Sequence, residues 1–146
     1  LTEACLLTDT SYAALTAHAT EADYPQRVAE VGQRLVAGGV PMVAVTGVQW
    51  RNTTLCNIAV SAQGYTVFSS PRIGGHFSGT GDLFAAAVGG CLLRGQTFSA
   101  AVETATRFLQ QAVAATDGDG RHGVCFEPFL STLTDIACQP RRETAR

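Results

Sequence analysis

The chain of 146 residues has a formal net charge of −2, and 46% of its residues are hydrophobic and 15% are charged. This length and composition predict a single domain, residues 1–146, with a sizeable core, and they exclude a disordered chain. Nothing points to a basic surface, and no apolar run reaches the roughly 20 residues of a membrane-spanning helix, so we expect no nucleic-acid or membrane partner. Five cysteines in apolar contexts, none spaced as C-x-x-C, predict reduced thiols and a cytoplasmic location.

The first predicted elements are helical. Weak helical signals run through residues 2–20. A clearer helix follows from Pro25, which suits a first helical turn, to the glycine pair at 38–39. The apolar residues of this second segment recur at helical spacing: Val28, Val31 and Leu35.

Three apolar, β-branched segments come next. The continuous run VPMVAVTG, residues 40–47, is typical of a strand that is buried on both faces, and it predicts a parallel sheet covered by helices. Residues 55–61 and 65–70 flank the turn-forming residues 62–64, and this pattern predicts a β-hairpin.

The second half of the chain is predicted to be mostly helical. One helix covers residues 82–95, and Thr97 or Ser99 caps the next helix. Residues 122–127 indicate a short strand, and residues 128–137 indicate a closing helix. Together the elements describe part of an α/β sandwich.

The segment GGHFSGTGDLFAAAVGG, residues 74–90, places glycines around one acid, Asp82, directly ahead of an apolar helix. Free N–H groups and the dipole at a helix start attract negative charge, and glycines let an anion approach the backbone. A transferring phosphoryl group needs such donors, and a neighbouring carboxylate can accept the proton of an attacking hydroxyl. The segment therefore indicates a phosphotransferase acting on an alcohol. The alternative is that Asp82 only caps the helix and the glycines only turn the chain.

Residues 78–93, SGTGDLFAAAVGGCLL, closely resemble the signature of the ribokinase-like superfamily and, within it, of the pyridoxal kinases. Residues 1–8, LTEACLLT, are similar to the family motif T-P-N-x-x-E-A-x-x-L-T. Residues 43–47, VAVTG, match its phosphate-contacting strand, and residues 123–128, GVCFEP, are similar to a segment lining its adenine pocket. The resemblance covers essentially the whole chain. It implies a ribokinase-like sandwich, in which helices flank a mainly parallel sheet.

The resemblance implies a role for each matching residue near the transferred phosphate. Asp82 would be the base that deprotonates the substrate hydroxyl. The backbone of Gly79, Thr80 and Gly81 would form the anion hole for the γ-phosphate. Glu3, the acid of the N-x-x-E motif, would organise Mg²⁺ and its waters.

Further contacts to ATP are implied by the same resemblance. Thr46, at the end of the buried strand, would contact the phosphates, and Gly47 would give the backbone room. His76, in the glycine-rich loop, is another candidate for a phosphate contact. The adenine would lie against the region 105–126 and against apolar side chains: Val67, Phe68 and Phe126.

The implied activity is ATP- and Mg²⁺-dependent phosphorylation of the 5′-hydroxymethyl group of pyridoxal, pyridoxine or pyridoxamine, by an enzyme that we expect to be a homodimer when full length. The main alternative is a hydroxymethylpyrimidine (phosphate) kinase of the same superfamily. That branch often reads G-T-G-C, so Asp82 followed by Leu-Phe-Ala favours the vitamin B6 branch. A sugar kinase and a non-catalytic nucleotide-binding remnant are further alternatives.

The chain departs from the family pattern at its beginning, because the Asn of N-x-x-E would stand immediately before Leu1. We therefore expect the chain to be the C-terminal, nucleotide-binding part of such a kinase. We also expect it to be inactive alone, since the vitamin-binding residues would lie upstream. Residues 139–146 are expected to form a flexible tail.

Overall fold

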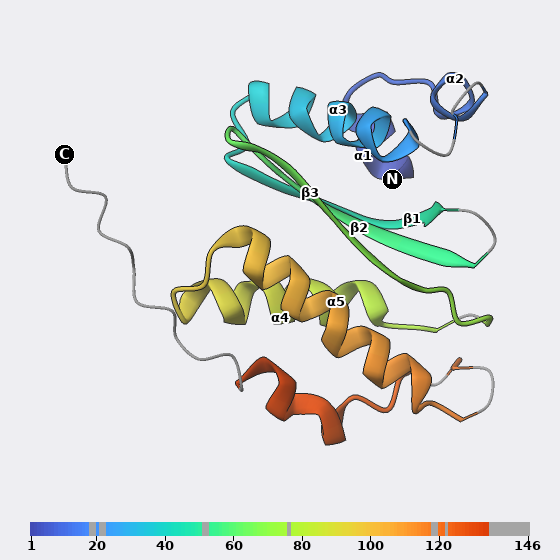
Figure 1. Ribbon diagram of the computed structural model, residues 1–146, viewed down its shortest axis with the longest axis vertical. Helices are drawn as coiled ribbons and strands as arrows, with labels where there is room; N and C mark the ends of the chain where they lie inside the picture. Colours follow the sequence, from blue (N-terminus) through green and yellow to red (C-terminus); the bar gives the residue numbers. More distant parts are fainter. Residues whose placement is uncertain are drawn as a thin grey trace. The chain divides into compact units, whose positions relative to one another are not determined.

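The computed structural model describes residues 1–17, 20, 23–50, 53–75, 77–117, 120, 121 and 123–134. The chain divides into two compact units, which we call the N-terminal unit (Leu1–Ile73) and the C-terminal unit (Gly74–Arg146). The N-terminal unit contains helices and a sheet, whereas the elements described in the C-terminal unit are helices (Figure 1). The expected α/β fold class is therefore confirmed.

Three helices open the N-terminal unit: α1 (Thr2–Leu7), α2 (Tyr12–Thr16) and α3 (Tyr24–Ala37). The weak helical signals of the sequence thus correspond to two short helices. α3 carries Pro25 in its first turn and ends at Gly38, as its sequence pattern predicted. Proline suits this position because the first N–H groups of a helix have no intrahelical acceptor.

The sheet of the N-terminal unit contains β1 (Met42–Trp50), β2 (Thr54–Ser61) and β3 (Gly64–Pro71), in the order β1-β2-β3. The predicted hairpin is confirmed as β2 and β3. The parallel pairing that we expected for the first strand is not found among the described strands, because β1 also pairs antiparallel with β2. The reason is the short connection. Parallel strands need a crossover of about a dozen residues or more, and residues 51–53 alone separate β1 from β2.

One face of this sheet packs against α3 (Figure 1). Side chains alternate between the two faces of a strand, so every second residue of β2 shares a face. Three such residues, Cys56, Ile58 and Val60, are buried in one cluster with Val28 and Val31 of α3. Burial of an aliphatic side chain of this size contributes about 1.5–3 kcal/mol. This face therefore contains the core of the N-terminal unit.

The C-terminal unit contains α4 (Thr80–Leu93), α5 (Phe98–Ala114) and the short 3-10 helix η1 (Glu127–Leu133). α5 packs against both α4 and η1, and its apolar residues at helical spacing are buried. Of the two predicted caps, Thr97 is the one used, since its hydroxyl oxygen accepts from the N–H of Ala100 at 3.3 Å. Within the described ranges, no helix combines the length and apolar character needed to cross a membrane.

The short strand predicted over 122–127 is absent from its described residues. The N–H of Cys125 donates to the hydroxyl oxygen of Thr116 at 2.9 Å. This N–H is therefore bonded to a side chain and is not free to pair with a neighbouring strand. The backbone of this segment is therefore attached to the end of α5 instead of to a sheet.

The closing helix predicted over 128–137 is described as the 3-10 helix η1. Its backbone bonds span three residues, as in the bond from the N–H of Phe129 to the carbonyl of Phe126 at 3.0 Å. The hydroxyl of Thr132 donates to Gln111 of α5 at 2.7 Å, which attaches η1 to its neighbour. The tail predicted at 139–146 lies outside the described residues.

Candidate active site

α4 begins with the glycine-rich segment that we predicted to bind phosphate. Gly79 precedes the helix with a φ of +79°, in the left-handed region that favours glycine. Thr80, Gly81 and Asp82 are the first three helical residues, whose N–H groups have no acceptor within a helix. Considering the described residues alone, none of these three N–H groups donates a hydrogen bond. The helix start therefore offers clustered donors and the positive end of a dipole to an anion.

Gly81 is not required by the backbone conformation, since its φ is not positive. A Cβ built at this position has no heavy atom of the described structure within 4 Å. In a helix, glycine is less favourable than alanine by about 0.8–1.0 kcal/mol. Neither conformation nor packing accounts for this glycine, whereas close approach of an external group to the backbone would.

The carboxylate of Asp82 is exposed and has no hydrogen-bond or ion-pair partner among the described residues. The N-cap is Gly79, and no side chain caps the helix. The alternative that Asp82 only caps α4 is therefore unsupported by its contacts, although a carboxylate in a first turn does favour the helix dipole. What remains is a free acid next to three open N–H groups.

The loop before α4 is attached to a second turn of the same unit. The N–H of Ser78 donates to the carbonyl of Gly120 at 3.1 Å, and the N–H of Gly123 donates to the same carbonyl at 3.1 Å. The hydroxyl of Thr80 donates to the carbonyl of Phe77 at 3.2 Å, so this hydroxyl is engaged within the loop. These bonds hold the approach to α4 in place. His76, our further candidate for a phosphate contact, lies outside the described residues.

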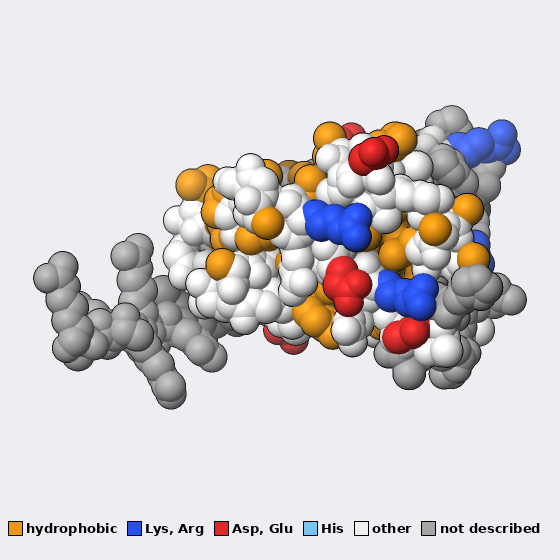
Figure 2. Space-filling model, turned by 90° about the horizontal axis from the view of Figure 1, so that it is seen from above, with side chains coloured by type: hydrophobic (Ala, Val, Ile, Leu, Met, Phe, Trp, Pro, Cys, Tyr) orange, Lys and Arg blue, Asp and Glu red, His pale blue; other side chains and the backbone are white. Residues whose placement is uncertain are grey.

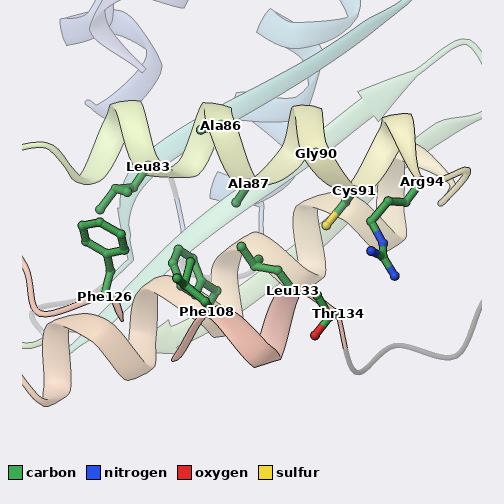
Figure 3. A pocket seen from close by; sticks show the side chains of 11 residues that line it. Leu83, Ala86, Ala87, Gly90, Cys91, Arg94, Phe108, Phe126, Leu133 and Thr134 are labelled. Atoms are coloured by element: carbon green, nitrogen blue, oxygen red, sulfur yellow. The ribbon is translucent and has the colours of Figure 1, made fainter. Parts of the chain in front are cut away.

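An apolar pocket of about 230 Å³ runs along α4, between this helix, α5 and η1 (Figure 3). Leu83, the residue after Asp82, points toward Phe126, which we predicted to contact the adenine (Figure 3). Arg94 and Thr134 bring the polar groups, and the rest of the lining is apolar: Leu83, Ala86, Ala87, Gly90, Cys91, Phe108, Phe126, Leu130 and Leu133. Phe126 thus lines an apolar pocket within the C-terminal unit.

In the N-terminal unit, Thr46 and Gly47 form a bulge in β1. The pairing with β2 shifts between Val45 and Val48, so these two residues together face Asn57. Gly47 has a φ of +65°, and its N–H donates to the side-chain oxygen of Asn57 at 3.2 Å. Val45 and Val48 are three positions apart, and in a regular strand they would point to opposite faces of the sheet. The extra residue of the bulge lets both side chains lie in the core.

The two adenine contacts predicted on β3 differ in their surroundings. Val67 pairs with Ile58 and packs against the core cluster under α3. Phe68 follows it in the strand and therefore points to the opposite face. There Phe68 pairs with Asn57, the residue that faces the bulge. Packing accounts for Val67, whereas Phe68 shares a sheet face with the predicted phosphate-contacting segment.

Asn57 was not among the predicted site residues. It lies in β2 with apolar neighbours on both sides, and only 7% of its surface is exposed. A buried amide is unfavourable unless it is hydrogen-bonded, so a lone Asn in an apolar strand was the available signal.

Glu3, the predicted metal-organising acid, lies in the first turn of α1 with 85% of its side chain exposed. Hydrogen bonding to its own backbone N–H lowers the pKa of this carboxyl below its ordinary value. In the described ranges, no group of three His, Cys, Asp or Glu side chains could hold a metal ion. Mg²⁺ fits one such carboxylate, since it is commonly bound by one or two carboxylates together with substrate phosphates and water.

The predicted site residues thus form one set in each unit. Glu3, Thr46, Gly47, Val67 and Phe68 belong to the N-terminal unit, and Gly79, Thr80, Gly81, Asp82 and Phe126 belong to the C-terminal unit.

Known proteins resemble the chain in sequence and in fold. Residues 3–124 match the family model described as phosphomethylpyrimidine kinase. No curated protein matches the chain significantly. The expected ribokinase-like α/β architecture is confirmed by solved structures that cover nearly all of the chain.

Two crystal forms of a protein from Bacteroides thetaiotaomicron, provisionally named phosphomethylpyrimidine kinase, are similar to the chain. One form has a TM-score of 0.74 at 28% identity and covers 95% of this chain. The other, a form with pyridoxal, has a TM-score of 0.71 at 27% identity and covers 92%. Pyridoxal kinase from Lactobacillus plantarum has a TM-score of 0.68 at 26% identity and covers 90%. The chain spans about half the length of these structures, 46–47%.

Proposed function

The chain belongs to the phosphomethylpyrimidine kinase family, and on this premise we propose that it supplies the phosphate-binding and catalytic part of an ATP-dependent kinase. The acceptor is the 5′-hydroxymethyl group of a vitamin B6 compound: pyridoxal, pyridoxine or pyridoxamine. The observation that carries this proposal is the start of α4, where a partner-free carboxylate at Asp82 follows N–H groups that have no acceptor in the described structure.

Asp82 acts as the general base. Its carboxylate accepts the proton of the substrate hydroxyl while the hydroxyl oxygen forms a bond to the γ-phosphorus. The bond between this phosphorus and the oxygen bridging to the β-phosphate breaks, and ADP leaves with that oxygen. Negative charge on the transferring group is stabilised by the expected anion hole, the N–H groups of Gly79, Thr80 and Gly81, and by the N–H of Asp82. These donors are already oriented before the reaction.

The remaining residues bind and orient the nucleotide. The hydroxyl of Thr46 contacts phosphate oxygens beside the exposed backbone of Gly47. Phe68 and Phe126 are the aromatic contacts for the base, whereas Val67 serves the core. Glu3 would hold Mg²⁺ through water, and the ion, when bound, neutralises phosphate charge.

Two observations bear on the acceptor. Asp82 followed by Leu-Phe-Ala favours the B6 vitamers, as do the similar structures named pyridoxal kinase or containing pyridoxal. The name of the matching family model supports the second candidate, a hydroxymethylpyrimidine (phosphate) kinase. Both acceptors carry a hydroxymethyl group on an aromatic nitrogen heterocycle, so the same base and anion site serve either reaction.

The test is ADP release by the purified full-length protein with Mg·ATP and, in turn, pyridoxal, pyridoxine, pyridoxamine and hydroxymethylpyrimidine. We expect the largest kcat/KM with a B6 vitamer. Preference for the pyrimidine would establish the second candidate. Binding of ADP without turnover of any acceptor would show a non-catalytic nucleotide-binding protein and overturn both.

A further inference from the structure

Asn57 lies between two residues that the proposed function assigns to the nucleotide. On one side it faces the bulge of Thr46 and Gly47 in β1, and on the other it pairs with Phe68 in β3. Its side-chain oxygen accepts the N–H of Gly47 at 3.2 Å. The three strands thus bring the bulge, Asn57 and Phe68 into one row across the sheet.

The bulge itself creates the need for this bond. An extra residue in a strand interrupts the ladder, so one N–H loses its backbone acceptor. Here that donor belongs to Gly47, and the acceptor that replaces the ladder carbonyl is a buried side chain. Because β1 and β2 are neighbouring strands, the amide side chain of Asn57 is long enough to reach the bulge. Leu55 and Ala59, which lie on the same sheet face as Asn57, are apolar. If this position served only hydrophobic packing, an aliphatic residue would suit it better than Asn.

We infer that Asn57 is a positioning residue for the nucleotide: it fixes the bulge in β1 and so presents the hydroxyl of Thr46 to the phosphates. This inference rests on the proposed function. Without the bond, the unpaired N–H of Gly47 turns toward water and the bulge takes up other conformations. Thr46 then spends less time in the orientation that binds.

The test is a double-mutant cycle on the full-length protein, with the Kd of ADP in the presence of Mg²⁺ as the readout. Asn57→Leu keeps the size of the side chain and removes the acceptor. We expect it to weaken ADP binding about tenfold, the effect of about 1.4 kcal/mol. Thr46→Ala should weaken binding to a similar extent. Because Asn57 acts through Thr46, Asn57→Leu should have almost no further effect in the Thr46→Ala background.

Ser70→Ala is the matched control, because Ser70 is also buried and lies in β3 on the same sheet face. It should leave the Kd of ADP unchanged. Amide exchange gives a second readout that needs no ligand: the N–H of Gly47 should be protected in the wild type and in Asn57→Asp, which keeps an acceptor oxygen, and exposed in Asn57→Leu. If Asn57→Leu does not fold, Asn57→Ala replaces it in the cycle.

The outcomes separate the inference from the proposed function. A wild-type protein that binds no ADP would overturn the function. If Thr46→Ala weakens ADP binding and the Asn57 variants do not, the function stands and the inference is wrong. Equal and additive losses from both substitutions, or rapid exchange of the Gly47 N–H in the wild type, would also overturn the inference.

Discussion

The bulge in β1 and the start of α4 both expose backbone next to a left-handed glycine, but they treat their N–H groups in opposite ways. At the bulge, the N–H of Gly47 is bonded to Asn57 inside the protein. At the helix start, the N–H groups after Gly79 have no acceptor in the described structure. A backbone N–H that is bonded inside the protein fixes the conformation of its segment and so orients a neighbouring side chain, here that of Thr46. A backbone N–H without an acceptor is itself available to bind a ligand. A substitution of the bulge glycine, Gly47, should therefore affect stability first, and substitutions at the helix start should affect nucleotide binding first.

The largest effect is expected when the bulge in β1 and the start of α4 are asked to catalyse the reaction without the rest of the kinase. Residues 1–146 alone should bind Mg·ATP weakly and should not phosphorylate pyridoxal above background, as measured by release of ADP. The reason is that rate depends on holding the acceptor in line with the γ-phosphate, and the chain spans only about half of its structural relatives. Supplying the remaining part of the protein, in the same chain or separately, should restore turnover. Full activity of residues 1–146 would mean that the acceptor site lies within them.

At the helix start, Asp82→Asn should lower kcat by roughly 10²–10⁴-fold, since it removes the proton acceptor while keeping the shape of the side chain. The Kd of ADP should change little, and the free energy of unfolding by less than about 1 kcal/mol, the usual limit for a helix-dipole contact. Glu103→Gln, at an exposed acid of α5, is the control and should leave kcat unchanged. Wild-type turnover in Asp82→Asn would remove Asp82 from the mechanism.

Gly81→Ala should separate binding from stability. The added methyl group meets nothing in the described structure, so the helix should gain up to about 1 kcal/mol. The same methyl group occupies the space through which a phosphate approaches, so calorimetry should show ADP binding weaker by about tenfold or more, roughly 1.4 kcal/mol. Gly81→Val should lose more binding, again without unfolding the protein.

Gly89→Ala is the matched control for this substitution, because Gly89 lies in the same helix with no atom of the described structure near its Cβ position. It should stabilise the protein to a similar extent and leave ADP binding unchanged. If Gly81→Ala behaves in the same way, the glycines of this segment only turn the chain.

At the bulge, the expected effect is on stability and does not involve catalysis. Gly47→Ala should lower the free energy of unfolding by about 1–2 kcal/mol, because an L residue is strained at a φ of +65°. Chemical denaturation of this variant beside Gly81→Ala should therefore give changes of opposite sign. Equal stabilisation of both variants would show that the left-handed backbone at Gly47 is not maintained in solution.

Much of the fold was predictable because local patterns decide it. The stripe at Val28, Val31 and Leu35 predicted α3, and the turn-forming residues 62–64 predicted the hairpin. The parallel pairing expected for the first strand is not found among the described strands. An apolar run shows that a strand is buried without showing which strand lies beside it. The 3-10 form of η1 was missed for a related reason: proline in a first turn is compatible with either helix type.

By itself, the sequence determined that backbone donors and an acid meet at the start of α4, because Gly79 to Asp82 are consecutive and a helix start orients their N–H groups without outside help. It also determined the elements that carry the site. Only the tertiary structure decided that Thr46, Asn57 and Phe68 lie in one row, that Val67 serves the core, and that Phe126 lines a pocket. These relations join residues from different elements, through strand register and helix packing. A one-residue bulge changes which side chains share a face, and no local pattern in the sequence records that shift.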